Sequence, residues 1–98
     1  MPKNKKINLI CEERLKKYFS ITGKALKIAK KHINSKKKSE AKEILDMVSC
    51  YFVDAIYFEK QGNYVNAFAC LNYAHGWLDT GSKLGIFNVK DNRLFVVK

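Results

Sequence analysis

Apolar residues recur along most of this chain at steps of three and four, the spacing that gives an α-helix one apolar face. Three segments carry the pattern, at about residues 9–34, 39–61 and 63–84. The stripe of the first segment consists of Leu15, Phe19, Thr22, Leu26, Ala29 and Ile33. The 98 residues are enough for one domain with its own core. The pattern therefore predicts an all-α fold, a three-helix bundle in a single domain over residues 1–98.

The expected helix ends carry residue types that favour them. Ser39 is a candidate N-cap for the second helix, and Gly62 follows its expected end. Asn63 is a candidate N-cap for the third helix, and Gly85 lies just past its end. These positions predict short, well-defined connections.

The second segment has two apolar stripes. Its main face consists of Ala41, Ile44, Leu45, Val48, Phe52, Ala55 and Ile56. A second stripe beside it consists of Met47, Tyr51, Asp54 and Phe58. Two stripes predict that this helix packs against two neighbours.

The third segment is nearly free of charge, since residues 62–85 contain only Asp79 and Lys83 as charged side chains. Its central stripe repeats in steps of four and three and consists of Ala67, Leu71, Ala74, Leu78 and Gly81. The small residues should let a neighbour approach closely. Because the remaining arc is also apolar, the helix needs cover beyond two partner helices. We expect the tail or a second subunit to supply this cover. We also predict an oligomer that is built partly on this helix or on the tail.

The two ends of the chain differ from the helices. Residues 1–8 are polar and basic, and we expect them to be disordered. Residues 86–98 contain β-branched and aromatic residues in extended runs. A lone strand is marginal in a helical domain. The tail should therefore lie extended on the bundle, or pair with its copy in a dimer.

The positive charge is concentrated in the first third of the chain. Residues 1–38 contain 13 Lys or Arg residues and two Glu residues. Residues 39–98 contain six Lys or Arg residues and seven acidic residues. A candidate anion-binding face lies on the first helix and consists of Lys16, Lys17, Lys24, Lys27, Lys30 and Lys31. Such a face predicts weak, non-specific nucleic-acid binding. Arg14 is the one arginine there and aromatics are not interleaved with the lysines, so an ordinary solvated surface is the alternative.

Three polar residues share one side of the third helix, namely Asn72, His75 and Asp79. A His and an Asp four residues apart could bind a metal or act as a base with its orienting carboxylate. A third ligand would have to come from Asp54 or a tyrosine. The alternatives are a site for ligand or partner recognition, and a hydrogen-bonded polar seam that fixes helix register, with Asp79 holding the His75 ring. We favour the seam, and therefore expect no cofactor, no metal and no enzyme activity.

Cysteines and hydropathy bear on the cellular compartment. Cys11, Cys50 and Cys70 are an odd set without close spacing, so neither a disulfide framework nor a metal site is predicted. We expect them to be small buried hydrophobic residues. No apolar run approaches the roughly 18 residues that a membrane span needs, and the basic start lacks the apolar region of a signal peptide. The expected location is the cytoplasm, without membrane binding.

Residues 51–89, "YFVDAIYFEKQGNYVNAFACLNYAHGWLDTGSKLGIFNV", resemble the core pattern of an archaeal family catalogued as domain of unknown function 357. The most specific part is the run "NYAHGWLD-G-LG-F". The resemblance implies a short protein with a three-helix, up-and-down bundle and no assigned activity. Some relatives look like appendages to nucleotidyltransferase-like domains, which implies an accessory role. Thr80 stands where the family has a small residue.

These observations together predict a non-enzymatic helical-bundle module that acts by self-association or by docking to a larger partner protein. The alternative function is a small accessory RNA-binding protein that uses the lysine face of the first helix. The sequence has no HExxH motif and no Gly-rich phosphate loop.

Overall fold

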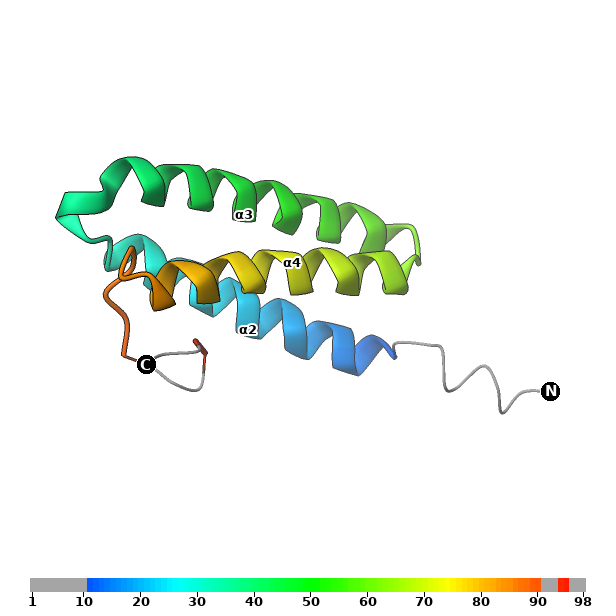
Figure 1. The fold of residues 1–98 in the computed structure, drawn as a ribbon. Coiled ribbons are helices and arrows are strands. Elements are labelled where there is room, and N and C mark those ends of the chain that lie inside the picture. Colours follow the sequence, from blue (N-terminus) through cyan, green and yellow to red (C-terminus); the bar gives the residue numbers. More distant parts are fainter. Residues whose placement is uncertain (1–10, 91–93, 96–98) are drawn as a thin grey trace.

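In the computed structural model of the chain, residues 11–90 and 94–95 are described. They form three long helices, α2 (Glu12–Lys31), α3 (Lys38–Lys60) and α4 (Tyr64–Lys83), and a short 3-10 helix, η1 (Ser35–Lys37). Figure 1 shows α2 and α4 running in one direction and α3 in the other. The predicted all-α, three-helix up-and-down bundle is confirmed. The expected disorder of residues 1–8 lies outside the described residues.

The connection between α2 and α3 differs from its prediction. The first helix ends at Lys31 instead of residue 34, because Ile33 forms an antiparallel bridge with Phe87 of the tail. Asn34 then starts η1, and its side chain accepts a hydrogen bond from the backbone N–H of Lys36. The predicted N-cap at Ser39 is wrong, because η1 continues directly into α3 and leaves Ser39 inside the first turn.

The connection between α3 and α4 is a tight turn. Gly62 has a φ of 76°, in the left-handed region that glycine enters without steric cost, and its N–H donates to the carbonyl of Glu59. Asn63 caps α4, since its side chain accepts from the backbone N–H of Asn66 at 3.3 Å. The turn is therefore built by the local residue types that the sequence indicated.

The central stripe of α4 is the axis of the bundle. Its members are all buried, namely Ala67, Leu71, Ala74, Leu78 and Gly81. The helix packs along both α3 and α2, while α2 and α3 make few contacts with each other. Alanine has a small side chain and glycine has none, so both neighbouring helices can approach α4 closely at these positions.

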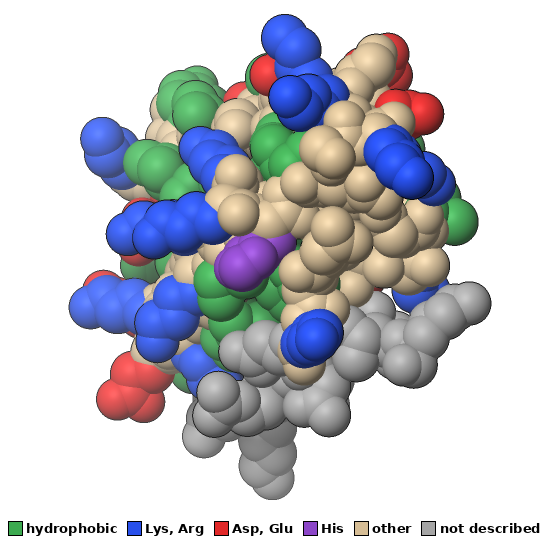
Figure 2. All heavy atoms as spheres, turned by 90° about the vertical axis from the view of Figure 1, so that its left-hand side faces the viewer, with side chains coloured by type: hydrophobic (Ala, Val, Ile, Leu, Met, Phe, Trp, Pro, Cys, Tyr) green, Lys and Arg blue, Asp and Glu red, His purple; other side chains and the backbone are tan. Residues whose placement is uncertain are grey.

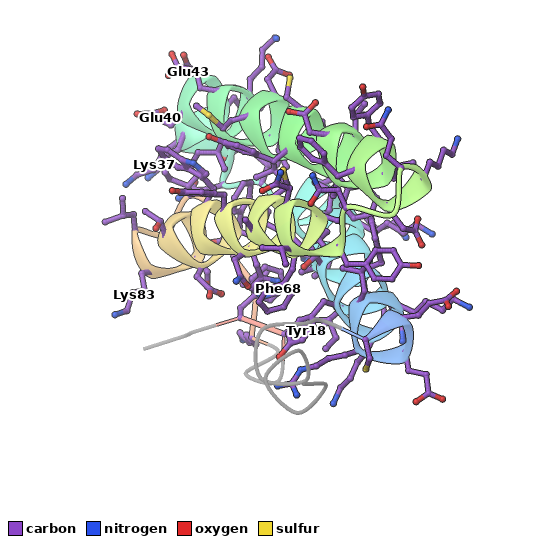
Figure 3. The ribbon with its side chains drawn as sticks, turned by 90° about the vertical axis from the view of Figure 1, so that its right-hand side faces the viewer. Tyr18, Lys37, Glu40, Glu43, Phe68 and Lys83 are labelled. Carbon is purple, nitrogen blue, oxygen red and sulfur yellow. The ribbon has the colours of Figure 1, made fainter. Side chains whose placement is uncertain are left out.

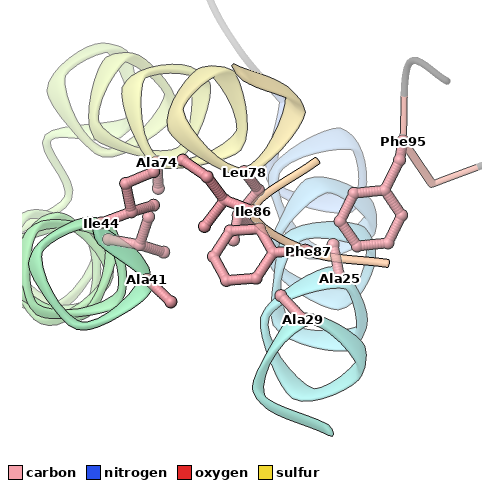
Figure 4. Close-up of a cluster of buried hydrophobic side chains, with 10 residues drawn as sticks. Ala25, Ala29, Ala41, Ile44, Ala74, Leu78, Ile86, Phe87 and Phe95 are labelled. Carbon is pink, nitrogen blue, oxygen red and sulfur yellow. The ribbon is translucent and has the colours of Figure 1, made fainter. Parts of the chain in front are cut away.

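The tail completes the core at the end where α2 joins α3. Phe87 projects between the helices there and is fully buried, as Figure 4 shows. The ring passes so close to Gly81 that an added Cβ would lie under 3.0 Å from it, nearer than real Cβ atoms approach. The glycine therefore makes room for a side chain of the tail.

Backbone hydrogen bonds hold the start of the tail against the connection between α2 and α3. The N–H of Asn34 donates to the carbonyl of Ile86 at 2.9 Å, and the N–H of Asn88 donates to the carbonyl of His32 at 2.7 Å. Of the two alternatives for the tail, its described part lies on the bundle of its own chain. The positions at 91–93 and 96–98 lie outside the described residues.

The cysteines are less buried than predicted. Cys11 and Cys50 are exposed, Cys70 is half-buried, and all three are free thiols. The prediction of buried residues was wrong for the first two, because Cys11 precedes α2 and Cys50 lies on the outward side of α3. Across the part of the chain that the structure describes, no helix is both long and apolar enough to cross a membrane.

Candidate functional site

His75 connects three parts of the fold. It lies on the side of α4 that faces α2, where Nδ1 is 3.2 Å from the hydroxyl of Thr22. Its Nε2 is 2.6 Å from the backbone carbonyl oxygen of Leu94 in the tail. Thr22 is buried in the stripe of α2. A single imidazole ring therefore joins α2, α4 and the tail.

The partners determine which ring nitrogen carries the proton. A carbonyl oxygen can only accept, so Nε2 of His75 must be the donor to Leu94. In the neutral ring Nδ1 is then an acceptor, and the hydroxyl of Thr22 donates to it. Both nitrogens are engaged, as a half-buried polar ring requires.

The structure brings three predicted polar residues to one place. Asn72, His75 and Asp79 line an open hollow of about 350 Å³ between α4 and α2, together with Tyr18, Ile21, Thr22 and Gly76. An oxygen of Asp79 lies 3.8 Å from Nε2 of His75, beyond hydrogen-bonding distance. The hydrogen bond that was predicted for Asp79 is made instead by the carbonyl of Leu94.

Asp54 is not part of this group. It lies on α3, on the opposite flank of α4, where its charge acts on the thiol of Cys70. Burial, and after it the negative charge of Asp54, raise the pKa of the Cys70 thiol. Among the described residues, no three His, Cys, Asp or Glu side chains are grouped closely enough to hold a metal ion.

Sequence reasoning missed the two groups that bind the ring of His75. A threonine inside an otherwise apolar stripe was a usable signal for Thr22, because a buried hydroxyl needs a partner. The carbonyl of Leu94 had no signal, since backbone atoms carry no residue-specific pattern and the contact spans 19 residues.

The lysine face is exposed, with all six of its residues directed to solvent: Lys16, Lys17, Lys24, Lys27, Lys30 and Lys31. Lys30 also lines an open groove of about 410 Å³ between α2 and α3, where Lys38 and Lys42 join it. Asp46 lies 2.8 Å from Nζ of Lys42 and raises its pKa. In Figure 2 Lys and Arg side chains are spread over the end of the molecule that faces the viewer, with several of them along its left-hand side.

The large exposed hydrophobic residues lie elsewhere. In the described part of the chain they occur on α3, on α4 and at the C-cap of α4. They are Met47, Val53 and Tyr57 on α3, Val65, Tyr73 and Trp77 on α4, and Leu84 at its C-cap. On the side of α4 that faces α2, Tyr18 of α2 meets Phe68 with ring centroids 4.9 Å apart (Figure 3). Tyr73 stacks on Tyr51 of α3 with ring centroids 5.5 Å apart. We refer to these exposed hydrophobic side chains of α3 and α4 together as the outer apolar surface; on α3 the acidic residues Glu43, Asp46 and Asp54 lie among them.

Two helices packed on a central α4, with a tail held by a histidine, define the chain as a small helical-bundle protein. Residues 17–87 match the model of a protein family described as "Protein of unknown function (DUF357)", and the chain belongs to this family. Neither the curated proteins nor the solved structures gave a match.

Proposed function

We propose that this chain is a non-enzymatic interaction module that works by association, through a second copy of itself or a larger partner protein. The observation that carries the proposal is the outer apolar surface. Its exposed members on α4 and its C-cap include Val65 at 53%, Tyr73 at 63% and Leu84 at 59% of their full accessible area. Large apolar side chains that are exposed in this number mark interaction sites in soluble proteins where they gather on one face.

The distribution of charge supports the same proposal. The exposed residues of α4 from Val65 to Thr80 include no charged side chain, in a chain with a net charge of +10. Interface centres are depleted in charge and enriched in aromatic residues. His75, the residue with most potential for chemistry, is engaged by Thr22 and Leu94 in holding the fold.

We place this module in the cytoplasm. The support is that all three cysteines are free thiols, which suits a reducing compartment.

Sedimentation equilibrium from low to high micromolar concentration tests the proposal. We expect mass to rise with concentration, and Val65→Lys to weaken the association. Ser20→Lys is the matched control, because it adds the same charge on the exposed side of α2. A monomer at every concentration, together with no partner protein retained from a nuclease-treated native extract, would contradict the proposal.

A second candidate function is weak binding of RNA or another polyanion by the lysine face. The observation that favours it is the groove between α2 and α3, where Lys30 of one helix lies across from Lys38 and Lys42 of the other. Lysines from two helices along one groove could contact successive phosphates. The salt dependence of binding tests this candidate.

A further inference from the structure

We infer that the outward face of α4 is the contact surface for a second copy of this chain, with the two α4 helices closest at Gly76. This inference rests on the proposed function and specifies its partner. The outward face consists of the exposed residues Val65, Asn66, Ala69, Asn72, Tyr73, Gly76, Trp77, Thr80, Lys83 and the C-cap Leu84.

Gly76 has no role inside its own chain that would require a glycine. It lies in the interior of α4, it is exposed, and an added Cβ would meet no atom within 4 Å. Gly81 by contrast makes room for Phe87, and Gly62 and Gly85 have positive φ. A glycine inside a helix destabilises it relative to alanine. Close approach by another chain would explain the residue, since glycine lets two helix backbones come near each other.

The residues around Gly76 suit a dry contact. Tyr73 and Trp77 flank it with 63% and 38% of their area exposed. The hydroxyl of Thr80 donates to the carbonyl of Gly76 at 2.9 Å, so this polar group is satisfied within the helix and needs no water. The two large rings lie beside Gly76, which has no side chain, so a helix of another chain can pack against the rings and approach the backbone there.

Charge identifies the occupant as a second copy. A two-fold contact sets one surface against the same surface of the other subunit, so like charges on it would face each other. The exposed side of α2 would oppose lysines to lysines. The outward side of α3 would oppose the acidic residues Glu43, Asp46 and Asp54 to their own copies. The outward face of α4 has less of this repulsion, since no exposed residue from Val65 to Thr80 is charged and its one exposed charge, Lys83, lies at the last residue of the helix.

Trp77 provides a local readout because it is the one tryptophan of the chain. Its emission should shift to the blue as concentration rises, since dimerisation would remove its exposed 38% from water. The dissociation constant from this shift should agree with the one from sedimentation equilibrium. The agreement would locate the contact on α4.

Substitution of Gly76 tests the point of closest approach. Gly76→Ala and Gly76→Gln should raise the melting temperature of the dilute monomer by roughly 2–8 °C, because both residues are better helix formers. The same changes should weaken dimerisation, Gly76→Gln by at least about tenfold. Gly23→Ala is the control, since it makes the same exchange on α2, where a Cβ would meet only the ring of Phe52 at 3.6 Å.

The outcomes separate the inference from the proposed function. Greater monomer stability with weaker association in the Gly76 variants, and unchanged association in Gly23→Ala, would support both. If the wild-type protein dimerises with the same constant as both Gly76 variants, the contact is elsewhere and only the inference falls. A wild-type protein that remains monomeric at high micromolar concentration, without a shift of Trp77 emission, overturns the inference and self-association with it.

Discussion

His75 makes two hydrogen bonds between parts of the fold that are far apart in the sequence. Replacing it with alanine leaves the hydroxyl of Thr22 and the carbonyl of Leu94 without their partner. A buried polar group that loses its partner costs about 1–3 kcal/mol. His75→Ala should therefore lower the unfolding midpoint in urea and release the tail. Asp79→Asn should lower it less, because the Asp79 oxygen is 3.8 Å from the ring.

Thr22→Val controls for this interpretation, since it removes one of the two hydrogen bonds and keeps the shape of the side chain. It should destabilise the protein less than His75→Ala. One outcome would contradict the structural role and show that the ring has a functional role. In that outcome, substitution of both His75 and Asp79 leaves stability and oligomeric state unchanged but abolishes metal uptake or partner binding.

The three thiols should differ in their rate of modification. Cys50 is exposed, whereas Cys70 is half-buried and its pKa is raised by burial and by the charge of Asp54. Because the thiolate is the reactive form, a raised pKa slows the reaction at neutral pH. Mass spectrometry of the alkylated protein should find Cys50 and Cys11 modified before Cys70. Asp54→Asn should accelerate Cys70 modestly, since burial remains, and equal rates for Cys50 and Cys70 would contradict the argument.

At the scale of single residues, the sequence predicted positions better than partners. The side of α4 that holds Asn72, His75 and Asp79 follows from helical spacing, and the structure places all three around one hollow. The partner of the ring could not be predicted, because Leu94 contributes a backbone atom. Asp54 was assigned to the same group by residue type alone, and its position on the far side of α4 depends on how α3 packs.

At the scale of the elements, the stripe of α4 was fully predictable and its purpose was not. The spacing of Ala67, Leu71, Ala74, Leu78 and Gly81 identifies a buried face without knowledge of the neighbours. The ring that occupies the space above Gly81 comes from the tail, which the pattern left open between two arrangements. The end of α2 was missed for the same reason, because the bridge between Ile33 and Phe87 is a contact distant in sequence.

Gly81→Ala tests how the tail packs on α4. Alanine favours the helix by up to about 1 kcal/mol, but its Cβ would overlap the ring of Phe87. Overpacking in a core costs about 1–3 kcal/mol, so the substitution should lower the free energy of unfolding. A double-mutant cycle with Phe87→Leu should show a coupling of at least about 0.5 kcal/mol. Additive effects would mean that the tail does not pack against Gly81 in solution.

At the scale of the whole molecule, the three helices expose three chemically different surfaces. The exposed side of α2 carries lysines, the outward side of α3 carries Glu43, Asp46 and Asp54 around Met47, and the outward face of α4 has no exposed charge before Lys83 at its end. Each helix buries one stripe in the shared core, so its remaining arc is free to serve a separate contact. A dimer through α4 would leave both lysine faces exposed. Self-association and weak polyanion binding are therefore compatible in one molecule.

The lysine face should bind nucleic acid only through charge. Replacing Lys24, Lys27, Lys30 and Lys31 with Gln should abolish RNA binding, and the wild-type slope of log affinity against log salt should be about −3 to −4 if these four contact phosphates. Fluorescence anisotropy with an unstructured RNA over a salt series measures both. The control replaces Lys60, Lys83 and Lys90 with Gln, which lowers the net charge without touching α2 and should preserve most of the binding. Tight binding that depends on RNA sequence and survives loss of the four lysines would contradict this prediction, because point charges on flexible stems recognise phosphate and not bases.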